Sequence, residues 1–307
     1  MDELVERWRT LARSDRQRIL LADAGDERVL EAQRTIEEEG LAIAEIVSEE
    51  RHLTPAVRKF AAESRSAIDL SDPLNVAVAS VAVGEADGCV AGASRPSSHV
   101  IRSGLRILGL ATENSVVSGA FLFLLRPTSP GARTSVIAFA DCAVVVEPDS
   151  EQLASIARST AHTFRSLTET EALVAMLSFS TKGSAEHPSV EKVRKATALV
   201  RSQASDLAID GEIQFDAAFD SSVAKTKAAT SLVAGNANVF VFPNLDAGNI
   251  AYKILERLGG ATAYGPLLQG LNGTLHDLSR GCSVDDIVGV TVIAAVQAQQ
   301  DKRIETA

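Results

Sequence analysis

The stretch RILLADAGDERVLEAQRTIEEEGLAIAEIV, residues 18–47, decides the class of fold. Its first six residues form an apolar run that ends at Asp23, and residues 41–47 form a second apolar run. Between them, residues 29–39 carry a helical pattern that ends at Gly40, and glycine commonly follows the last turn of a helix. A strand, a helix and a strand within about thirty residues predict a βαβ unit, and therefore a parallel sheet covered by helices.

The alternation of strand and helix patterns continues along the chain. The apolar runs 116–125 and 135–146 are joined by the turn-rich segment 127–131, which predicts a hairpin and hence a mixed sheet. Residues 77–83 fit a helix or a strand equally well. Further strands are predicted at 172–178, 207–209 and 239–242, and helices at 2–12, 100–108, 152–167, 190–200, 250–258 and 284–299. The first of these helices places Leu4, Val5, Trp8 and Leu11 on one face.

Length, charge and cysteine usage exclude several classes of protein. A chain of 307 residues predicts about two domains. The net charge of −10 and an aromatic content of 4% disfavour a nucleic-acid partner. Three widely spaced cysteines predict no disulfide framework, and the apolar stretches are too short for a membrane span. We therefore expect a cytoplasmic protein with no membrane partner.

The strongest candidate site is the segment Asp277-Leu-Ser-Arg-Gly-Cys-Ser-Val-Asp-Asp286, just ahead of the last predicted helix. In one interpretation Ser283 and Asp286 form a capping box, and Arg280 pairs with a nearby acid. In the other, the helix N-terminus and Arg280 bind an anionic oxygen, with Asp286 as a candidate base. Spacing alone favours the capping interpretation.

Two further segments are candidate anion sites. Val90-Ala-Gly-Ala-Ser-Arg-Pro-Ser-Ser-His99 leads into a helix, where Ser97, Ser98 and Arg102 could hold a phosphate. Ser178-Phe-Ser-Thr-Lys-Gly-Ser184 follows a predicted strand, and its candidate binding residues are Ser180, Thr181 and Lys182. The second of these segments lacks the order of a nucleotide-triphosphate loop, and no spacing of Cys and His indicates a metal.

In combination these segments resemble the phosphate acetyltransferases, which belong to the phosphate acetyl/butyryl transferase family. The resemblance rests first on residues 277–283 with Asp286, preceded by Gly265-Pro-Leu-Leu-Gln-Gly-Leu-Asn272. It extends to residues 26–30, 139–143, 178–184, 210–216, 235–240 and 247–249, and so covers nearly the whole chain.

The resemblance implies an α/β fold of two three-layer αβα lobes around a cleft, similar to isocitrate and isopropylmalate dehydrogenases. One lobe would comprise residues 1–112 and 266–307, with the catalytic motif, and the other residues 113–265. The implied reaction is the reversible conversion of acetyl-CoA and phosphate to acetyl phosphate and CoA, by direct thiolate attack in a ternary complex. CoA would be a substrate, no cofactor or metal would be required, and the protein would be a homodimer.

The resemblance also implies roles for individual residues. Asp286 matches the general base for the CoA thiol, Arg280 the arginine that stabilises the transition state, and Ser279 the serine that polarises the carbonyl or leaving group. Arg102 matches a substrate-binding arginine, and Ser97, Ser98, Ser180, Thr181 and Lys182 complete the expected substrate-binding set.

The sequence also departs from the family pattern. Arg95-Pro-Ser-Ser-His99 replaces a run similar to His-Thr-Thr-Ala-Asp, Ser103 replaces a usual proline, and a basic segment expected upstream is missing. Three alternatives therefore stay open. They are a transferase for propionyl or butyryl groups, a noncatalytic relative that binds CoA or acyl phosphate, and, on fold alone, an NAD-dependent hydroxyacid dehydrogenase.

Overall fold

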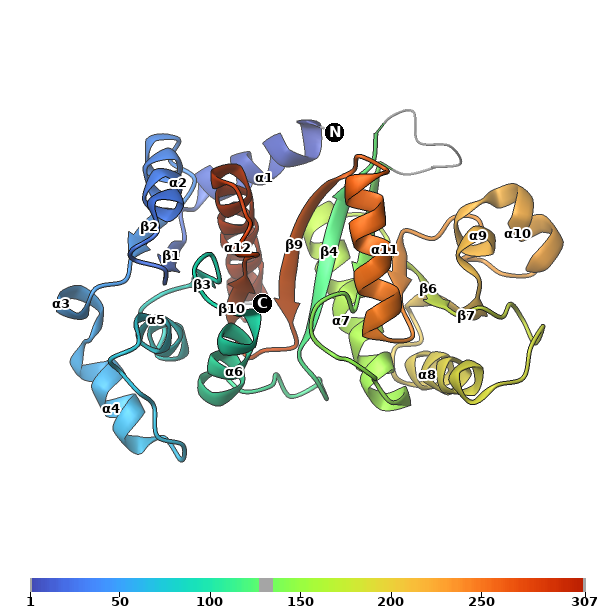
Figure 1. Ribbon diagram of the computed structural model, residues 1–307, viewed down its shortest axis with the longest axis horizontal. Coiled ribbons are helices and arrows are strands. Elements are labelled where there is room, and N and C mark those ends of the chain that lie inside the picture. Colours follow the sequence, from blue (N-terminus) through green and yellow to red (C-terminus); the bar gives the residue numbers. More distant parts are fainter. Residues whose placement is uncertain (1, 127–134, 306–307) are drawn as a thin grey trace. The chain divides into compact units, whose positions relative to one another are not determined.

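A computed structural model describes residues 2–126 and 135–305, and the chain forms two compact units (Figure 1). We call residues 2–112 together with 265–305 the split unit, because two distant parts of the sequence build it. We call residues 113–264 the continuous unit. None of the helices in the described ranges combines the length and the apolar character needed to cross a membrane.

The split unit contains a four-stranded parallel sheet in the order β10-β3-β1-β2. Its elements are α1 (Asp2–Ser14), β1 (Arg18–Leu21), α2 (Glu27–Glu38), β2 (Ile43–Ile46), α3 (Glu49–His52), α4 (Pro55–Glu63), α5 (Pro73–Ala82), β3 (Gly88–Ala91), α6 (Ser97–Ile107), β10 (Thr274–Asp277) and α12 (Val284–Glu305).

The predicted βαβ unit is confirmed, since β1 and β2 pair in parallel on either side of α2 in the sequence. Strand β3 is buried along its whole length, because it lies inside the sheet between β1 and β10. Helices α2 and α12 pack together, as do α5 and α6, and the two pairs cover opposite faces of the sheet (Figure 1). The sheet is therefore the middle layer of three.

The split unit settles the ambiguity at residues 77–83 and shows where the apolar face of the first helix packs. Residues 77–82 belong to helix α5 and Val83 is its C-cap, because Asp72 caps its first turn and Pro73 occupies a position that needs no N–H. The apolar face of α1 packs on α12 of the same chain, and Trp8 is only 1% exposed. Gln299 of α12 strengthens this contact by donating to the carbonyl oxygen of Leu11 at 2.8 Å.

The continuous unit contains most of a six-stranded sheet in the order β7-β6-β8-β5-β4-β9. Strand β9 begins in this unit and ends in the split unit. The elements are β4 (Ser118–Leu124), β5 (Val136–Ala140), α7 (Ser150–Thr168), β6 (Leu173–Leu177), α8 (Pro188–Gln203), β7 (Ala208–Ile213), α9 (Phe215–Phe219), α10 (Ser221–Lys227), β8 (Val239–Val241), α11 (Leu245–Arg257) and β9 (Thr262–Gln269).

The expected mixed sheet is confirmed, because β4 and β5 are antiparallel whereas β5, β8, β6 and β7 are parallel. The predicted turn at 127–131 lies outside the described residues. The prediction that the second strand continues to residue 146 is wrong, since β5 ends at Ala140. The buried carboxylate of Asp141 accepts hydrogen bonds from the backbone N–H groups of Ala143, Val144 and Val145, so the chain curls around it.

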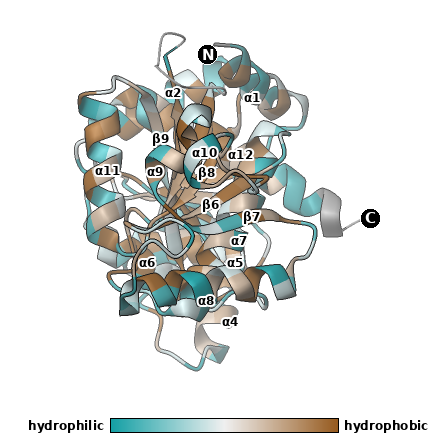
Figure 2. Ribbon diagram, turned by 90° about the vertical axis from the view of Figure 1, so that its right-hand side faces the viewer, coloured by the Kyte–Doolittle hydropathy of each residue, from teal (hydrophilic) through white to brown (hydrophobic). Residues whose placement is uncertain are grey.

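Phenylalanines that alternate along the strands build the main apolar core of the continuous unit. Phe121 and Phe139 are cross-strand partners, and Phe139 lies edge-on to Phe240 with 5.6 Å between ring centroids. Helices α9 and α11 cover this face, and α11 contributes Tyr252, which stacks on Phe121. Figure 2 shows α11 with both hydrophobic and hydrophilic stretches of ribbon. Helices α7 and α8 also pack on this sheet, and both of them contact β6.

Candidate functional site

Three strands of the split unit end at the same edge of the sheet, because β1, β3 and β10 are parallel neighbours. Asp23 follows β1, Gly92 follows β3, and Asp277 is the last residue of β10. In an open α/β sheet this carboxyl edge is where ligands bind. The two strongest candidate segments from the sequence therefore start side by side.

Gly92 lets the loop after β3 approach the loop after β10. Its φ is +114°, a conformation that residues with a side chain rarely adopt. A Cβ atom built there would lie 2.4 Å from Oδ1 of Asp277 and 2.6 Å from the backbone nitrogen of Leu278. The close contact of the two loops therefore requires glycine at this position.

The buried carboxylate of Asp23 organises the loop between β3 and α6. Its Oδ2 accepts hydrogen bonds from the backbone N–H groups of Gly92 at 2.7 Å and Ala93 at 3.0 Å. Its Oδ1 accepts from the hydroxyl of Ser94 at 2.7 Å and from Nε of Arg95 at 2.8 Å. Four donors satisfy a carboxylate that is only 3% exposed. The loop is thus fixed by a residue that follows a different strand.

Arg95, which departs from the family pattern, is held in a network of ion pairs. Its guanidinium bonds Asp23 on one side and Asp72 on the other, the latter at 2.9 Å. Asp72 also lies 3.1 Å from Nε2 of His99. With two carboxylates as partners and a side chain only 15% exposed, Arg95 stabilises the loop and is not a free cation for a ligand.

The first turn of α6 carries the predicted phosphate ligands. Ser97, Ser98 and Arg102 are all exposed. Pro96 precedes them and offers no side-chain cap. Ser97 lies close enough to Asp277, the last residue of β10, for its hydroxyl to lower the pKa of that carboxyl group. Arg102 lies one turn further along α6. Its exposed side chain forms no hydrogen bond or ion pair with another residue in the described ranges, so its guanidinium is available.

The turn between β10 and α12 holds the predicted catalytic residues together. Ser279 and Arg280 are exposed, and the turn is closed by a hydrogen bond from the Cys282 N–H to the Ser279 carbonyl oxygen at 2.9 Å. The capping box is present as well. Asp286 Oδ2 accepts from the Ser283 N–H at 2.8 Å, and Ser283 Oγ accepts from the Asp286 N–H at 3.1 Å. Asp286 nevertheless remains exposed, so capping does not exclude a chemical role.

Asp277 is an unusual carboxyl group beneath these loops. Burial raises its pKa to about 6, although the nearby Ser97 hydroxyl lowers it in part. The side chain is 1% exposed, and its Oδ1 has no hydrogen-bond partner among the described residues. A carboxyl group in these surroundings keeps its proton at a pH where most aspartates are ionised.

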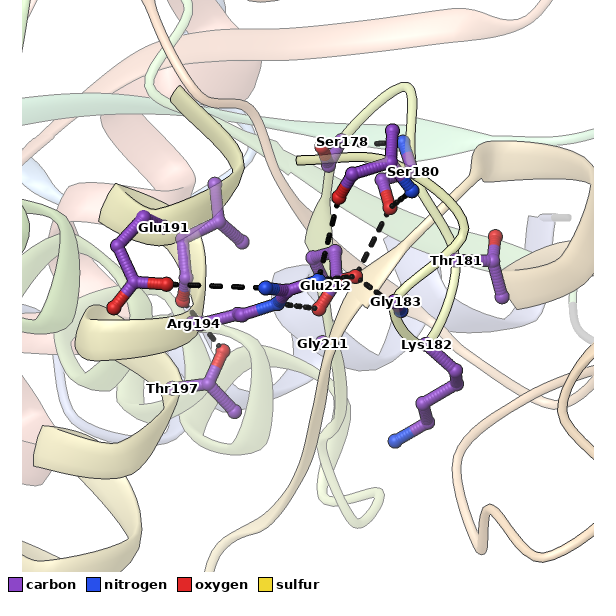
Figure 3. A network of polar contacts seen from close by, with 12 residues as sticks. Ser178, Ser180, Thr181, Lys182, Gly183, Glu191, Arg194, Thr197, Gly211 and Glu212 are labelled. Carbon is purple, nitrogen blue, oxygen red and sulfur yellow. Dashed lines mark hydrogen bonds and ion pairs between the residues drawn. The ribbon is translucent and has the colours of Figure 1, made fainter. Parts of the chain in front are cut away.

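The third candidate segment lies in the continuous unit and forms a turn closed by its own hydrogen bonds (Figure 3). The Ser180 hydroxyl is fully buried and donates to Oε1 of Glu212 at 3.0 Å. The Thr181 hydroxyl accepts from the Gln214 N–H at 2.9 Å. Nζ of Lys182 pairs with the buried Asp210. These side chains are engaged within the unit, and we expect Ser180 to shape the turn and not to touch a ligand.

Glu212 is the anchor of this turn. Its carboxylate also accepts hydrogen bonds from the Gly183 N–H at 2.7 Å and from Nε of Arg194 at 2.9 Å. Burial alone would raise the pKa of Glu212, but the bonds from Arg194, Gly183 and Ser180 outweigh burial and lower it to about 2. Figure 3 shows Arg194 and Gly183 converging on the same carboxylate.

The structure adds residues that the sequence did not identify as functional. Asp23 and Arg28 join the loops of the split unit, and Glu212 and Arg194 fix the turn of the continuous unit. The available signal for Asp23 was its position as an acidic residue directly after an apolar strand. In residues 2–126 and 135–305, no group of three or more His, Cys, Asp or Glu side chains is placed to hold a metal ion.

Comparison with known proteins finds relatives that match this chain over most of its length. The family described as "Phosphate acetyl/butaryl transferase" matches residues 56–295. A phosphate acetyltransferase of Paracoccus denitrificans is 44% identical over 92% of this chain and 95% of its own. A phosphate acetyltransferase of Acetivibrio thermocellus is 40% identical, and the match covers 98% of this chain and 99% of its own. The crystal structure of a phosphotransacetylase from Streptococcus pyogenes has a TM-score of 0.89 and 36% identity, and it covers 98% of this chain and 99% of its own.

The α/β fold, the exposed Ser-Arg turn at the carboxyl edge of a sheet and these matches define an enzyme of the acyltransferase class. The expected α/β fold class is confirmed. The chain belongs to the phosphate acetyl/butyryl transferase family.

Proposed function

We propose that this chain catalyses the reversible reaction of acetyl-CoA and phosphate to acetyl phosphate and CoA. Family membership supports the reaction class, and the relatives named as phosphate acetyltransferases support the acetyl group. The observation that carries the proposal is that Ser279 and Arg280, in the turn after β10, and Asp286, in the first turn of α12, are all exposed at the carboxyl edge of the parallel sheet. The split unit would then be the domain that carries the catalytic motif, with its boundaries near residues 112 and 265.

In the proposed mechanism the CoA thiol attacks the carbonyl carbon of acetyl phosphate. A carbon–sulfur bond forms, the bond between the carbonyl carbon and the oxygen that bridges to phosphorus breaks, and phosphate leaves. Asp286 accepts the thiol proton, Arg280 stabilises the negative charge on the carbonyl oxygen, and Ser279 donates a hydrogen bond to the carbonyl or leaving oxygen. The reverse reaction uses the same groups in the opposite order.

Proton transfer from a thiol to a carboxylate costs free energy, and the site must reduce this cost. The reference pKa values of a thiol and an aspartic acid differ by about four to five, which corresponds to about 6 kcal/mol. A guanidinium beside the sulfur or the carbonyl oxygen reduces this cost, because it stabilises the charge as it forms. Arg280 lies in the same exposed turn as Ser279 and is the group for this task.

The proposed substrate-binding groups lie at the start of α6. Ser97, Ser98 and Arg102 are exposed there, where free backbone N–H groups and a guanidinium together favour a phosphate. We propose that the turn of Ser180, Thr181 and Lys182 contributes to substrate binding through its shape and through its exposed lysine stem, since its polar atoms are already paired.

A phosphate-dependent assay of CoA release tests the proposed function. Asp286→Asn should lower kcat by at least about 100-fold, because the amide cannot accept the proton, while Asn still accepts the Ser283 N–H and preserves the cap. Asp285→Asn is the matched control, since Asp285 is the exposed neighbour in the same helical turn. Equal activity of the two variants would contradict the role of Asp286.

The acyl group is decided by comparing kcat/KM for acetyl-, propionyl- and butyryl-CoA. Ligand binding without turnover would identify a noncatalytic relative.

We also propose that the protein is a cytoplasmic homodimer. Its cysteines, Cys89, Cys142 and Cys282, are free and buried, which suits a reducing compartment. Helix α11 exposes Ile250, Ile254 and Leu258 at intervals of four residues, with exposed fractions of 58%, 52% and 84%. This aliphatic stripe supports a self-complementary interface. Light scattering should give a dimer for the wild type and a monomer for Ile254→Glu, and Leu232→Glu, on an exposed loop, is the control.

A further inference from the structure

Arg28, in the first turn of α2, uses every donor of its guanidinium to join three loops of the split unit. Nε and Nη2 donate to the two carboxylate oxygens of Asp26, at 3.0 and 2.6 Å. Nη2 also donates to the carbonyl oxygen of Ala93 at 2.8 Å. Nη1 donates to the carbonyl oxygens of Arg280 at 3.0 Å and Cys282 at 2.7 Å. A guanidinium has five N–H donors, and here each one has an oxygen acceptor.

The pair with Asp26 fixes the direction of the guanidinium before it meets the other loops. The contact is bidentate, so it holds the plane of the group as well as its charge. The Arg28 guanidinium keeps the pKa of Asp26 below its usual range, and Asp26 is itself tied to the start of α2 as its N-cap. The three remaining N–H donors of the Arg28 guanidinium are therefore held in fixed directions.

The acceptors of those three donors lie in the loops that carry the proposed chemistry. Ala93 belongs to the loop that leads to Ser97 and Arg102, and the carbonyl groups of Arg280 and Cys282 bracket the centre of the Ser279–Ser283 turn. Because the Arg280 carbonyl group is held, the backbone from which the Arg280 side chain extends is held as well. The bond to the Cys282 carbonyl oxygen likewise holds the start of α12, which carries Asp286. Displacement of reacting groups by about 1 Å can cost about 100-fold in rate.

We propose that Arg28 is a positioning residue for acyl transfer, which holds the Ser279–Ser283 turn in register with the loop after β3. The proposal rests on the proposed function of that turn. Arg28 touches no reacting atom, since all its donors are used by the protein. Lysine cannot replace it, because one ammonium nitrogen cannot reach acceptors in three loops at once.

Arg28→Lys and Arg28→Met test the proposal against Arg16→Lys as a matched control. Arg16 also links α2 to a second segment, through Glu37 at 2.8 Å and the Ala42 carbonyl oxygen at 2.6 Å, but it lies away from the turn. We expect both Arg28 variants to lose about 10- to 100-fold in kcat, with KM within about threefold of wild type, whereas the control keeps its kcat. Added guanidinium ion should restore part of the rate of Arg28→Ala.

A second measurement is independent of activity. The Cys282 N–H closes the turn by its bond to Ser279, so its hydrogen exchange should become faster in Arg28→Lys and stay unchanged in Arg16→Lys. If the Arg28 variants do not fold, Asp26→Asn provides the test, since it removes the bidentate anchor and keeps an N-cap; it should show the same loss of kcat to a smaller extent. Wild-type kcat in folded Arg28→Lys or in Asp26→Asn would overturn the proposal. An inactive wild type would instead overturn the proposed function.

Discussion

Replacing Glu212 by glutamine should destabilise the protein by about 3 kcal/mol at pH 7. The bonds around this carboxylate lower its pKa from an ordinary value of 4.5 to about 2. Each tenfold change in an acid dissociation constant is worth about 1.4 kcal/mol, so the ionised form favours the folded state by about 3 kcal/mol. Glutamine has no charge, and its NH₂ group would face the N–H donors of Arg194.

The sign of the pH dependence follows from the lowered pKa. The stabilisation is fully present above pH 4.5, and it is lost as the pH falls toward 2 and the folded protein also takes up the proton. The deficit of Glu212→Gln should therefore shrink from about 3 kcal/mol at pH 7 to about 2 kcal/mol at pH 3.5. Urea-induced unfolding followed by circular dichroism at these two pH values measures the difference.

A second carboxylate beside Arg194 serves as the control. Glu191 lies 3.8 Å from Nη1 of Arg194, but its side chain is 51% exposed. Exposed ion pairs are worth about 0 to 1 kcal/mol, so Glu191→Gln should change stability by less than about 0.5 kcal/mol. An equal cost for the two variants, or a cost of Glu212→Gln that does not depend on pH, would refute the assignment of the stabilisation to the buried anion.

Three further predictions concern the split unit. Burial raises the pKa of Asp277 to about 6, so its ionisation should cost stability as the pH rises from 4 to 6; Asp277→Asn should gain about 2 kcal/mol relative to wild type between pH 4 and pH 8, measured by urea unfolding. Gly92→Ala should cost at least about 3 kcal/mol in the same assay, because its Cβ would collide with Asp277 and Leu278, whereas Gly25→Ala, which meets no atom within 4 Å, should cost under about 1 kcal/mol. Arg280→Lys should lower kcat by at least about 10-fold with an unchanged Tm, since an exposed ammonium cannot reproduce the planar donor pair; a wild-type kcat would contradict the oxyanion role.

Much of the element order could be predicted from the sequence, because buried parallel strands are short apolar runs with clear ends. The βαβ unit at 18–47 and the hairpin strands follow this rule. Strands β9 and β10 were not predicted, since Gly265, Gly270 and Gly273 interrupt their pattern with signals typical of turns. The end of β5 depends on hydrogen bonds to Asp141 that no hydrophobic pattern contains.

The candidate site was predictable where its residues are neighbours in the sequence. Ser279 and Arg280 lie in the turn before α12, and Asp286 lies in the first turn of that helix. Ser97 and Arg102 lie at the start of α6. The residues that hold these segments were not predictable by spacing. Arg28 and Cys282 are 254 positions apart, and Asp23 and Arg95 are 72 apart, so only the folded sheet brings them into contact.

The split unit has a consequence for biosynthesis. Its sheet needs β10, and its helical layer needs α12, yet both come from the last part of the described chain, after the whole of residues 113–264. On the ribosome, β3 emerges early and must wait with an unpaired edge until β10 is translated, while the strands of the continuous unit appear consecutively. The Ser279–Ser283 turn, which we propose to take part in acyl transfer, is therefore translated after residues 113–264, and a nascent chain that stops before β10 lacks this turn.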